Sequence, residues 1–278
     1  MKCSFCFFAV LAMAVCAFPA QQSGVHNEKP QSVAAQKSGP GAARKSSSGK
    51  KHKSRSAAAQ KPVACPTISE TPEGPELKSL FSQMDAAAGA FHRAEADLTQ
   101  EDYQKVVADL TIETGKIYFR RTKKGLQVAM DFLSSPDSKY VLLADDKISF
   151  YQPKIDQVTE HPLGKNSSET ESMFALGFGG SSHDLLKSFD VKVAGSAVMD
   201  GVKTSKLELT PKTEGLKKYF SLIELWVDPA RDISLRQKFW QPSGDYHLAC
   251  YSNIKMNKRI SGRVFKLKTT RRTKTVTP

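Results

Sequence analysis

Two runs of alternating polar and apolar residues decide the fold: residues 116–132, which read KIYFRRTKKGLQVAMDF, and residues 141–150, which read VLLADDKISF. In the first run Ile117 and Phe119 alternate with polar neighbours, and Val128 and Met130 do the same after the turn at Gly125. A period of two is typical of β-strands that bury one face. The two runs therefore predict neighbouring strands joined by tight turns.

The same alternation returns toward the C-terminus. It covers residues 207–209, 223–227 and 233–239, and the last strands are expected near 247–254 and 263–270. Turn pairs such as Asp200-Gly201 and Ser243-Gly244 separate these runs. The pattern predicts an α+β fold built on an antiparallel sheet of about ten or eleven strands with one apolar face. A sheet of that length tends to curl, and its concave face must be covered.

Two helical segments are expected as covers. After Pro75, apolar residues recur at three- and four-residue spacing as far as Phe91, which is typical of one helix face. Residues 168–189 read as a helix-turn-helix inserted between strands, with glycines at 177, 179 and 180 forming a hinge or a tight turn. Covers of this kind enclose either a packed core or a ligand cavity.

The first 20 residues resemble a secretory signal. Lys2 precedes an apolar run from Phe5 to Val15, which is too short to span a bilayer comfortably. Cleavage is expected near Ala17 or Ala20, and the alternative is lipid anchoring at Cys16. The chain is therefore expected to leave the cytoplasm.

A tether is expected to follow over residues 21–74, which are rich in Ser, Ala and Lys. Residues 37–62 contain no Leu, Ile, Phe, Trp or Tyr, so they bury too little apolar surface to offset the entropy of ordering. We expect this tether to be disordered and the folded domain to occupy residues 75–278.

Only Cys65 and Cys250 lie outside the predicted signal. In an oxidising compartment they can form a disulfide, and the alternative is two unpaired thiols, because spacing alone does not show proximity. Neither cysteine has a second Cys or His at the spacing of a metal site.

The net charge of +13 comes from the ends of the chain. Residues 21–62 hold nine Lys/Arg and one acid, residues 255–278 hold nine Lys/Arg and no acid, and residues 63–254 carry −5. This distribution argues against a nucleic-acid-binding core. Basic ends suit an anionic membrane surface, and the alternative is that they are simply solvated.

Enzyme motifs are missing from the sequence. It contains neither a Gly-x-Ser-x-Gly elbow nor a His-Glu-x-x-His motif. Ser182, His183 and Asp184 are consecutive, so their side chains diverge, and they fit the start of a helix better than a catalytic triad. We expect no enzyme activity, no catalytic residue, no metal site and no cofactor.

Residues 146–158, which read DKISFYQPKIDQV, resemble a strand–turn–strand of the outer-membrane lipoprotein carrier proteins, the LolA-like family. Asp146 replaces the glycine of the family pattern. Further stretches agree in order over residues 76–270: Phe91-His92, Asp97–Gln100, Gly115–Phe119, Leu176–Gly179, Asp184-Leu185 and Phe189-Asp190.

The resemblance implies an incomplete β-barrel closed by a helical lid over an apolar cavity. It further implies a monomeric periplasmic carrier, or chaperone, for acylated lipoproteins or another lipid, with an inner-membrane donor complex and an outer-membrane receptor as partners. The family's lid-latching Arg is expected near Gln127, so the latch is predicted to differ here. No nucleic-acid partner is expected.

Apolar residues on the predicted strands and helices are the candidate site. The lipid-binding candidates are Phe119, Val128, Met130, Phe132, Leu143, Phe150, Leu209, Leu225 and Phe239. The lid candidates are Met84, Met173, Phe174, Leu176, Leu185 and Leu186. Each of them could instead be an ordinary core residue, and the methionines suit varied acyl chains because they adapt their shape.

A second function fits the same fold. Envelope-stress regulators with a similar domain sense lipid or unfolded outer-membrane protein and control a partner. The sequence names neither the cargo nor the donor and receptor.

Overall fold

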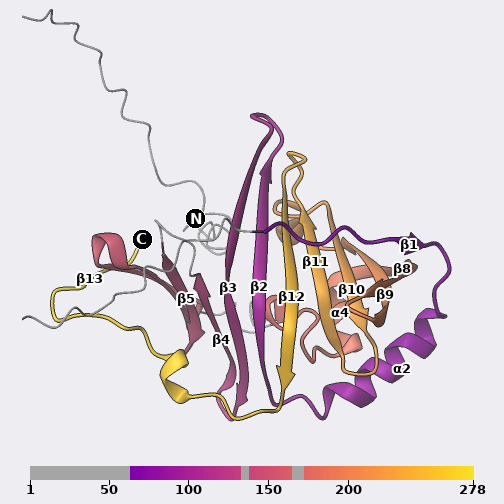
Figure 1. Ribbon diagram of the computed structural model, residues 1–278, viewed down its shortest axis with the longest axis horizontal. Helices are drawn as coiled ribbons and strands as arrows, with labels where there is room; N and C mark the ends of the chain where they lie inside the picture. The colour runs from indigo at the N-terminus through magenta and orange to yellow at the C-terminus, as the bar shows by residue number, and fades with distance from the viewer. Residues whose placement is uncertain (1–62, 133–137, 165–171) are drawn as a thin grey trace, which may run out of the picture.

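A computed structural model describes residues 63–132, 138–164 and 172–278 (Figure 1). The predicted signal and most of the predicted tether lie outside the described residues. The boundary predicted at residue 74 assigns Cys65 and strand β1 (Glu70–Thr71) to the tether, whereas in the structure they are joined to the sheet.

The described residues form thirteen strands in one sheet, in the order β1-β8-β9-β10-β11-β12-β2-β3-β4-β5-β6-β7-β13. The remaining strands are β2 (Arg93–Gln104), β3 (Asp109–Thr122), β4 (Gly125–Phe132), β5 (Lys139–Ala144), β6 (Lys147–Gln152), β7 (Gln157–Pro162), β8 (Phe189–Met199), β9 (Val202–Pro211), β10 (Leu222–Asp228), β11 (Ile233–Trp240), β12 (Tyr246–Met256) and β13 (Lys274–Val276). The sheet is mixed, because β13 runs parallel to β7. The expected ten or eleven strands miss both edge strands, since segments of two or three residues show no periodicity.

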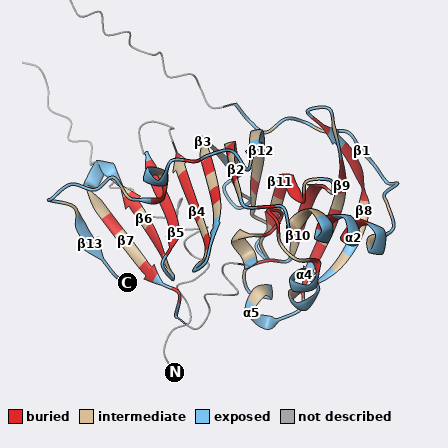
Figure 2. Ribbon diagram, turned by 90° about the horizontal axis from the view of Figure 1, so that it is seen from below, coloured by how far each residue is buried: buried red, intermediate tan, exposed pale blue. Residues whose placement is uncertain are grey.

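The sheet is open. Its edge strands β1 and β13 do not pair, and the sheet is neither closed nor strongly curled (Figure 2). The curled sheet and incomplete barrel expected from the sequence are therefore corrected to one open, mixed sheet. The physical reason is that β4–β7 are covered on both faces, so this half of the sheet has no apolar face left to hide by curling.

Helices cover one side of the sheet (Figure 2). They are α2 (Leu77–Ala88), α4 (Ser182–Ser188) and α5 (Glu214–Lys217), and two 3-10 helices, η1 (Pro153–Ile155) and η3 (Gly262–Phe265), lie in connections. Helix α2 buries Leu80, Phe81 and Met84 against the sheet, as the apolar spacing predicts. We call residues 172–188, the described part of the predicted lid, the insertion.

Strand β5 shows how the other face is covered. All six of its residues are buried, so the expected single apolar face is wrong for this half of the sheet. Val141 and Leu143 join the core on one face, while Tyr140 and Leu142 join a second cluster on the opposite face. The second cluster is closed by residues from the C-terminal end of the chain.

We call that end, residues 258–276, the C-terminal strap. The strand expected over residues 263–270 is wrong, because this stretch holds η3 and irregular backbone instead. Phe265 is buried in the second cluster, so the alternating pattern here marks single anchoring side chains rather than a strand. Eight Lys/Arg side chains of the strap are exposed: Lys258, Arg259, Arg263, Lys266, Lys268, Arg271, Arg272 and Lys274.

Cys65 and Cys250 form a disulfide with a Cα–Cα distance of 5.9 Å. The backbone N–H of Cys65 also donates to Glu101 Oε1 at 2.6 Å, so the bond fastens the chain ahead of β1 to β12 and β2. The sequence leaves open whether these two cysteines are paired or free, and the structure shows them paired. Disulfides of this kind are typical of exported proteins.

Removing this disulfide is expected to lower the free energy of unfolding. The bond joins residues 185 positions apart, and a loop of that length restrains the unfolded chain strongly. The Cys65→Ser/Cys250→Ser double variant should lose about 2–4 kcal/mol in urea unfolding, compared with the wild type under non-reducing conditions. An unchanged midpoint and slope would contradict the pairing.

Candidate functional site

The predicted lipid-binding residues lie in two clusters on the sheet. We call the core that Val141 and Leu143 join the central cluster. Five of the predicted residues are buried in it, and the half-buried Phe150 packs against it; the five are Phe119, Val128, Met130, Phe132 and Leu143. The other three, Leu209, Leu225 and Phe239, belong to a different cluster, which lies beneath helices α2 and α4. The predicted set is thus divided, and its ligand-binding role stays a prediction.

The side chains of Tyr251 and Gln237 form a buried polar pair between the central cluster and the cluster beneath the helices. The Tyr251 hydroxyl donates to Gln237 Oε1 at 3.0 Å, and Gln237 Nε2 donates to the carbonyl of Leu176 in the insertion at 2.6 Å. Burial raises the pKa of Tyr251, so its hydroxyl stays protonated and acts as the donor. These bonds place the insertion on this face of the sheet.

The predicted lid residues lie in two different clusters, and one of them lies on the surface. Met84, Leu176 and Leu185 are buried in the cluster beneath the helices, and Met173 packs against it. Phe174 packs against the central cluster instead. Leu186 is 42% exposed and turns away from both.

Phe178 is the central residue of the insertion, and the sequence does not single it out. Its side chain is 1% exposed. Its ring stacks on Phe119 at a centroid distance of 4.0 Å and meets the Tyr251 ring edge-on at 4.9 Å. The available signal was its place between two glycines, Gly177 and Gly179, which is unusual for an ordinary core aromatic.

Those two glycines make the tight turn that the sequence allows for. Both adopt positive φ, +71° at Gly177 and +70° at Gly179. A Cβ at position 177 would lie 2.0 Å from Ser234 Oγ, and one at position 179 would lie 2.7 Å from the Phe91 ring. Only glycine therefore permits the insertion to approach the sheet this closely.

Backbone hydrogen bonds join this turn to the beginning of β11. Gly179 N–H donates to the Asp232 carbonyl at 2.9 Å, and Ser234 N–H donates to the Gly177 carbonyl at 2.6 Å. Phe178 and Ile233 form an isolated antiparallel bridge. Helix α4 is fastened separately, because Asp85 of α2 accepts bonds from the N–H and the hydroxyl of Ser182 at 2.9 and 2.6 Å.

Arg121 of β3 supplies a side-chain latch. Its guanidinium donates to the Gly179 carbonyl and lies over the Phe91 ring, 5.7 Å from the centroid. Gln127, where the family pattern places its Arg, accepts instead from Arg120, whose guanidinium lies over Phe265 of the strap. The arginine that bonds the insertion is thus Arg121, and a latching role for it stays a prediction.

Arg121→Met is expected to loosen the insertion. A single hydrogen bond of this type contributes about 1 kcal/mol, so the amide of Gly179 should exchange its hydrogen about fivefold faster. Arg120→Met, which removes an arginine on the strap side, is the matched control and should leave this exchange unchanged. Equal exchange in the two variants would contradict the latch.

We call the place where residues 177–179 bond to the beginning of β11 the joint. Asp232 places a buried carboxyl group there. It is 0% exposed, and neither carboxylate oxygen has a hydrogen-bond partner among the described residues. Burial, reinforced by the nearby Asp85 carboxylate and opposed by Arg121, raises the pKa of Asp232 to about 7. The buried Ser234 hydroxyl, close by in β11, likewise lacks a partner within the described part of the chain. Unpaired buried groups of this kind destabilise the closed insertion.

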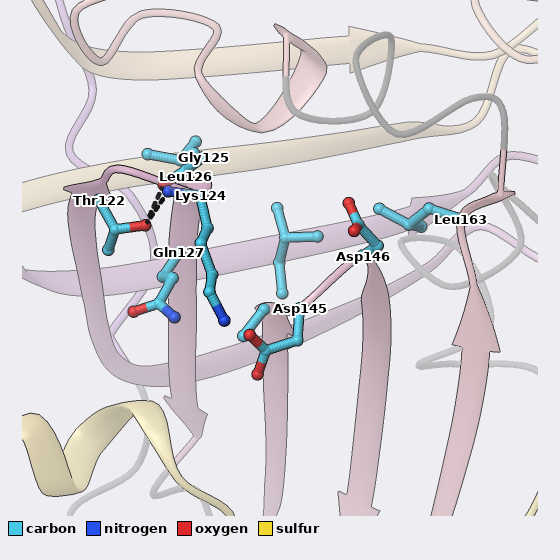
Figure 3. Close-up of a pocket in the computed structure, with 10 residues that line it drawn as sticks. Thr122, Lys124, Gly125, Leu126, Gln127, Asp145, Asp146 and Leu163 are labelled. Atoms are coloured by element: carbon cyan, nitrogen blue, oxygen red, sulfur yellow. Dashed lines mark hydrogen bonds between the residues drawn. The ribbon is translucent and has the colours of Figure 1, made fainter.

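A pocket opens at the rim of the sheet (Figure 3). Its walls come from the β3–β4 hairpin, with Thr122 and Gln127, and from the β5–β6 turn, with Asp145 and Asp146. The space that a water-sized sphere reaches is ≈ 10 Å³, which is about one water molecule. The pocket is thus far smaller than an acyl chain, and the central cluster beneath the insertion is filled by its own side chains.

Two further features of the described residues concern metal binding and membrane crossing. They contain no group of three or more His, Cys, Asp or Glu side chains arranged to hold a metal ion. Within the same residues, every helix is too short or too polar to cross a bilayer.

The sequence matches no family model and no curated protein. Among solved structures, it is similar to an uncharacterized conserved protein from Thermus thermophilus, at 11% identity and a TM-score of 0.46 over 72% of this chain and 98% of that one. It is also similar to a LolA superfamily protein from Nitrosomonas europaea, at 10% identity and a TM-score of 0.36 over 70% and 99%.

A third solved structure is the MucA/MucB complex of Pseudomonas aeruginosa, with 11% identity and a TM-score of 0.40 over 68% of this chain and 60% of that one. These neighbours include a protein named as a LolA superfamily member, the family that residues 146–158 resemble.

Proposed function

We propose that residues 63–278 form a carrier domain that binds acyl chains of lipoproteins, or of another lipid, under the insertion. The observation that supports this most is Phe178: an aromatic side chain on a separately fastened segment fills the apolar face of the sheet. When the insertion lifts, this ring leaves Phe119 and its neighbours, and an acyl chain takes its place. No bond is made or broken.

The free energy of acyl exposure makes such a carrier useful. Each methylene left in water costs about 0.8 kcal/mol, so a sixteen-carbon chain costs roughly 12 kcal/mol. A free-energy cost of this size prevents a lipid-modified protein from crossing an aqueous compartment unaided. The Cys65–Cys250 disulfide supports an oxidising location, and the proposed place of action is the periplasm, on the route to the outer membrane.

The closed state must be held weakly enough to open. The insertion is joined to the sheet by a few hydrogen bonds, and the unpaired Asp232 carboxylate lies directly at the joint. Apolar contacts of Phe178 close the insertion, while the buried charge favours opening. This balance supports exchange between a filled closed state and an open state that admits lipid.

Titration with a fluorescent fatty acid tests the proposal, together with mass spectrometry of lipid that co-purifies with the protein. Met130→Gln places a polar group in the central cluster and should weaken fatty-acid binding about tenfold or more, because burying a methionine side chain contributes about 1.5–3 kcal/mol. Leu142→Gln is the matched control, since Leu142 is equally buried but on the strap side. No uptake by the wild type, or equal losses in both variants, would rule out this site.

A second candidate function is the sensing of a partner protein. The tip of the β2–β3 hairpin exposes three apolar residues: Val106 at 91%, Val107 at 64% and Leu110 at 44%. Exposed apolar groups at a protruding tip are suited to contact with another chain. If fatty acid does not bind but an extended outer-membrane-protein peptide does, and Val106→Ser/Val107→Ser abolishes that binding, sensing is the better account.

A further inference from the structure

The C-terminal strap carries an unusual concentration of positive charge. Residues 255–278 contain nine Lys/Arg and no acid, and eight of the nine belong to the strap itself. All eight are exposed. Their mutual repulsion destabilises the folded state, so the fold must hold them in place by other contacts.

Apolar side chains hold the first half of the strap. Ile260 and Phe265 are buried in the cluster on the strap side of β4–β7, with Val264 and Leu267 packed beside them. The Tyr140 hydroxyl donates to the Val264 carbonyl. The basic residues on either side of these anchors are thereby fixed on the surface of the sheet.

Hydrogen bonds hold the second half. The Asp156 carboxylate accepts from the hydroxyls of Thr270 and Thr273 at 2.8 and 2.6 Å. Lys274 N–H donates to the Asp156 carbonyl at 3.0 Å, and β13 then pairs with β7. The strap is therefore a structured segment of the folded domain, although not the strand expected over residues 263–270.

The strap cations lack acidic partners, unlike several lysines of the domain body. Lysines of the domain body such as Lys116, Lys147, Lys206 and Lys212 form ion pairs with nearby acids. None of the eight strap cations forms an ion pair within the described residues. Their charge is thus available to an external anion.

The arrangement of the cations is extended. The strap runs from the end of β12 to β13 at the far edge (Figure 1), which lie seven strand spacings apart, or roughly 34 Å. A row of that length faces many anions at once, as a plane of lipid headgroups does, whereas a single small anion would meet only a few of the cations.

We propose that the C-terminal strap is a docking surface for an anionic phospholipid bilayer. Charge complementarity is the basis: basic clusters bind anionic leaflets electrostatically, with each Lys or Arg near the surface strengthening binding by about fivefold. An exported domain meets such leaflets, as the disulfide supports. The strap lies on the face opposite the helices (Figure 2), so docking leaves the insertion uncovered. This docking does not depend on acyl binding.

Flotation with vesicles tests the proposal, using the chain after removal of residues 1–20. One set of vesicles is pure phosphatidylcholine, and the other contains about 30 mol% phosphatidylglycerol. The protein should bind only the second set, and binding should disappear at about 1 M NaCl, where the screening length falls to about 3 Å.

Two matched variants separate the strap from total charge. Lys266→Gln/Lys268→Gln/Arg271→Gln/Arg272→Gln removes four strap charges and should reduce the partition coefficient at least about tenfold. Lys50→Gln/Lys51→Gln/Lys53→Gln/Arg55→Gln removes four charges from the predicted tether and should reduce it by less than about threefold. A third variant, Lys266→Arg/Lys268→Arg/Arg271→Lys/Arg272→Lys, keeps the charge and should bind as the wild type does, which controls for folding.

Three results would overturn the proposal. The first is equal binding to both vesicle sets, and the second is equal loss of binding in the strap and tether variants. The third is binding to soluble polyglutamate without binding to vesicles, which would assign the strap to an acidic polypeptide. Fatty-acid titration of the strap variant should match the wild type, so failure of docking and failure of the carrier function are distinguishable.

Discussion

Phe178→Ala is expected to weaken closure of the insertion by about 3–5 kcal/mol, the usual loss for truncating a buried aromatic side chain. The wild-type ring is 1% exposed and contacts both Phe119 and Tyr251, so its removal leaves a space over the central cluster. Hydrogen exchange measures the effect directly at the amides of Gly179 and Ser234, which bond across the joint. Exchange there should become about 150- to 5,000-fold faster, while amides of β2 and β3 keep their protection.

The same variant is expected to bind fatty acid more tightly than the wild type. An acyl chain no longer has to displace the ring, so the free energy of opening is smaller. Phe220→Ala is the control, because Phe220 is similarly buried but belongs to the cluster beneath the helices. Should Phe178→Ala leave exchange at the joint unchanged, or lower the affinity for fatty acid, the proposed role of this ring is wrong.

Asp232→Asn is expected to make closure of the insertion nearly independent of pH. In the wild type the closed state binds a proton on Asp232 with a pKa of about 7, whereas an aspartate in water has a pKa near 3.9. Between these values the closed state keeps a proton that the exposed group has lost, so closure is strongest below about pH 4 and weakens as pH rises to 7. The total loss is up to about 4 kcal/mol, and above pH 7 it stays constant.

Hydrogen exchange at Gly179, corrected for the intrinsic rate, gives the free energy of opening at pH 5 and pH 8. The wild type should lose about 2.5 kcal/mol between them, and Asp232→Asn should lose less than about 1 kcal/mol. Asn is the suitable replacement because residue 232 has a φ of +50°, which Asn tolerates and Ala does not. Asp228→Asn in the same turn is the control and should keep the wild-type pH dependence. A parallel pH dependence in wild type and Asp232→Asn would contradict this role of the carboxylate.

Local patterns account for what the sequence predicts well. The strands of the β2–β4 and β10–β12 regions alternate over many residues, and α2 shows a clear apolar stripe, so their type follows from period alone. The candidates Phe119, Val128 and Met130 are buried together because they alternate on adjacent strands.

Long-range contacts explain the rest. Phe178, Arg121 and Asp232 meet across more than 50 positions of sequence, and the two glycines beside Phe178 are the one local pattern that marks any of the three. Strand β5 is buried on both faces only because a segment more than 100 residues later covers it. The same segment was expected as a strand, since Phe265 and Leu267 alternate with lysines although they serve as anchors of the strap.

The strap and the insertion lie on opposite faces of the sheet, so the two proposals assign separate tasks to them. The strap would bring the domain to an anionic leaflet by charge. The insertion would then open on the other side, and the pH of the compartment would bias that opening through Asp232. Each task can fail in experiment without affecting the other.

The central claim is that an acyl chain binds only when the insertion lifts from the sheet, and a reversible crosslink tests it most directly. Phe178 and Ile233 are bridge partners, whose Cα atoms in antiparallel pairs lie about 4.5–5.5 Å apart, within reach of a disulfide. In Phe178→Cys/Ile233→Cys the oxidised form should take up less than about a tenth of the fluorescent fatty acid bound by Phe178→Cys alone, and reductant should restore uptake. The wild type given the same reductant controls for the Cys65–Cys250 bond. Uptake by the oxidised double variant equal to that of Phe178→Cys would contradict the claim.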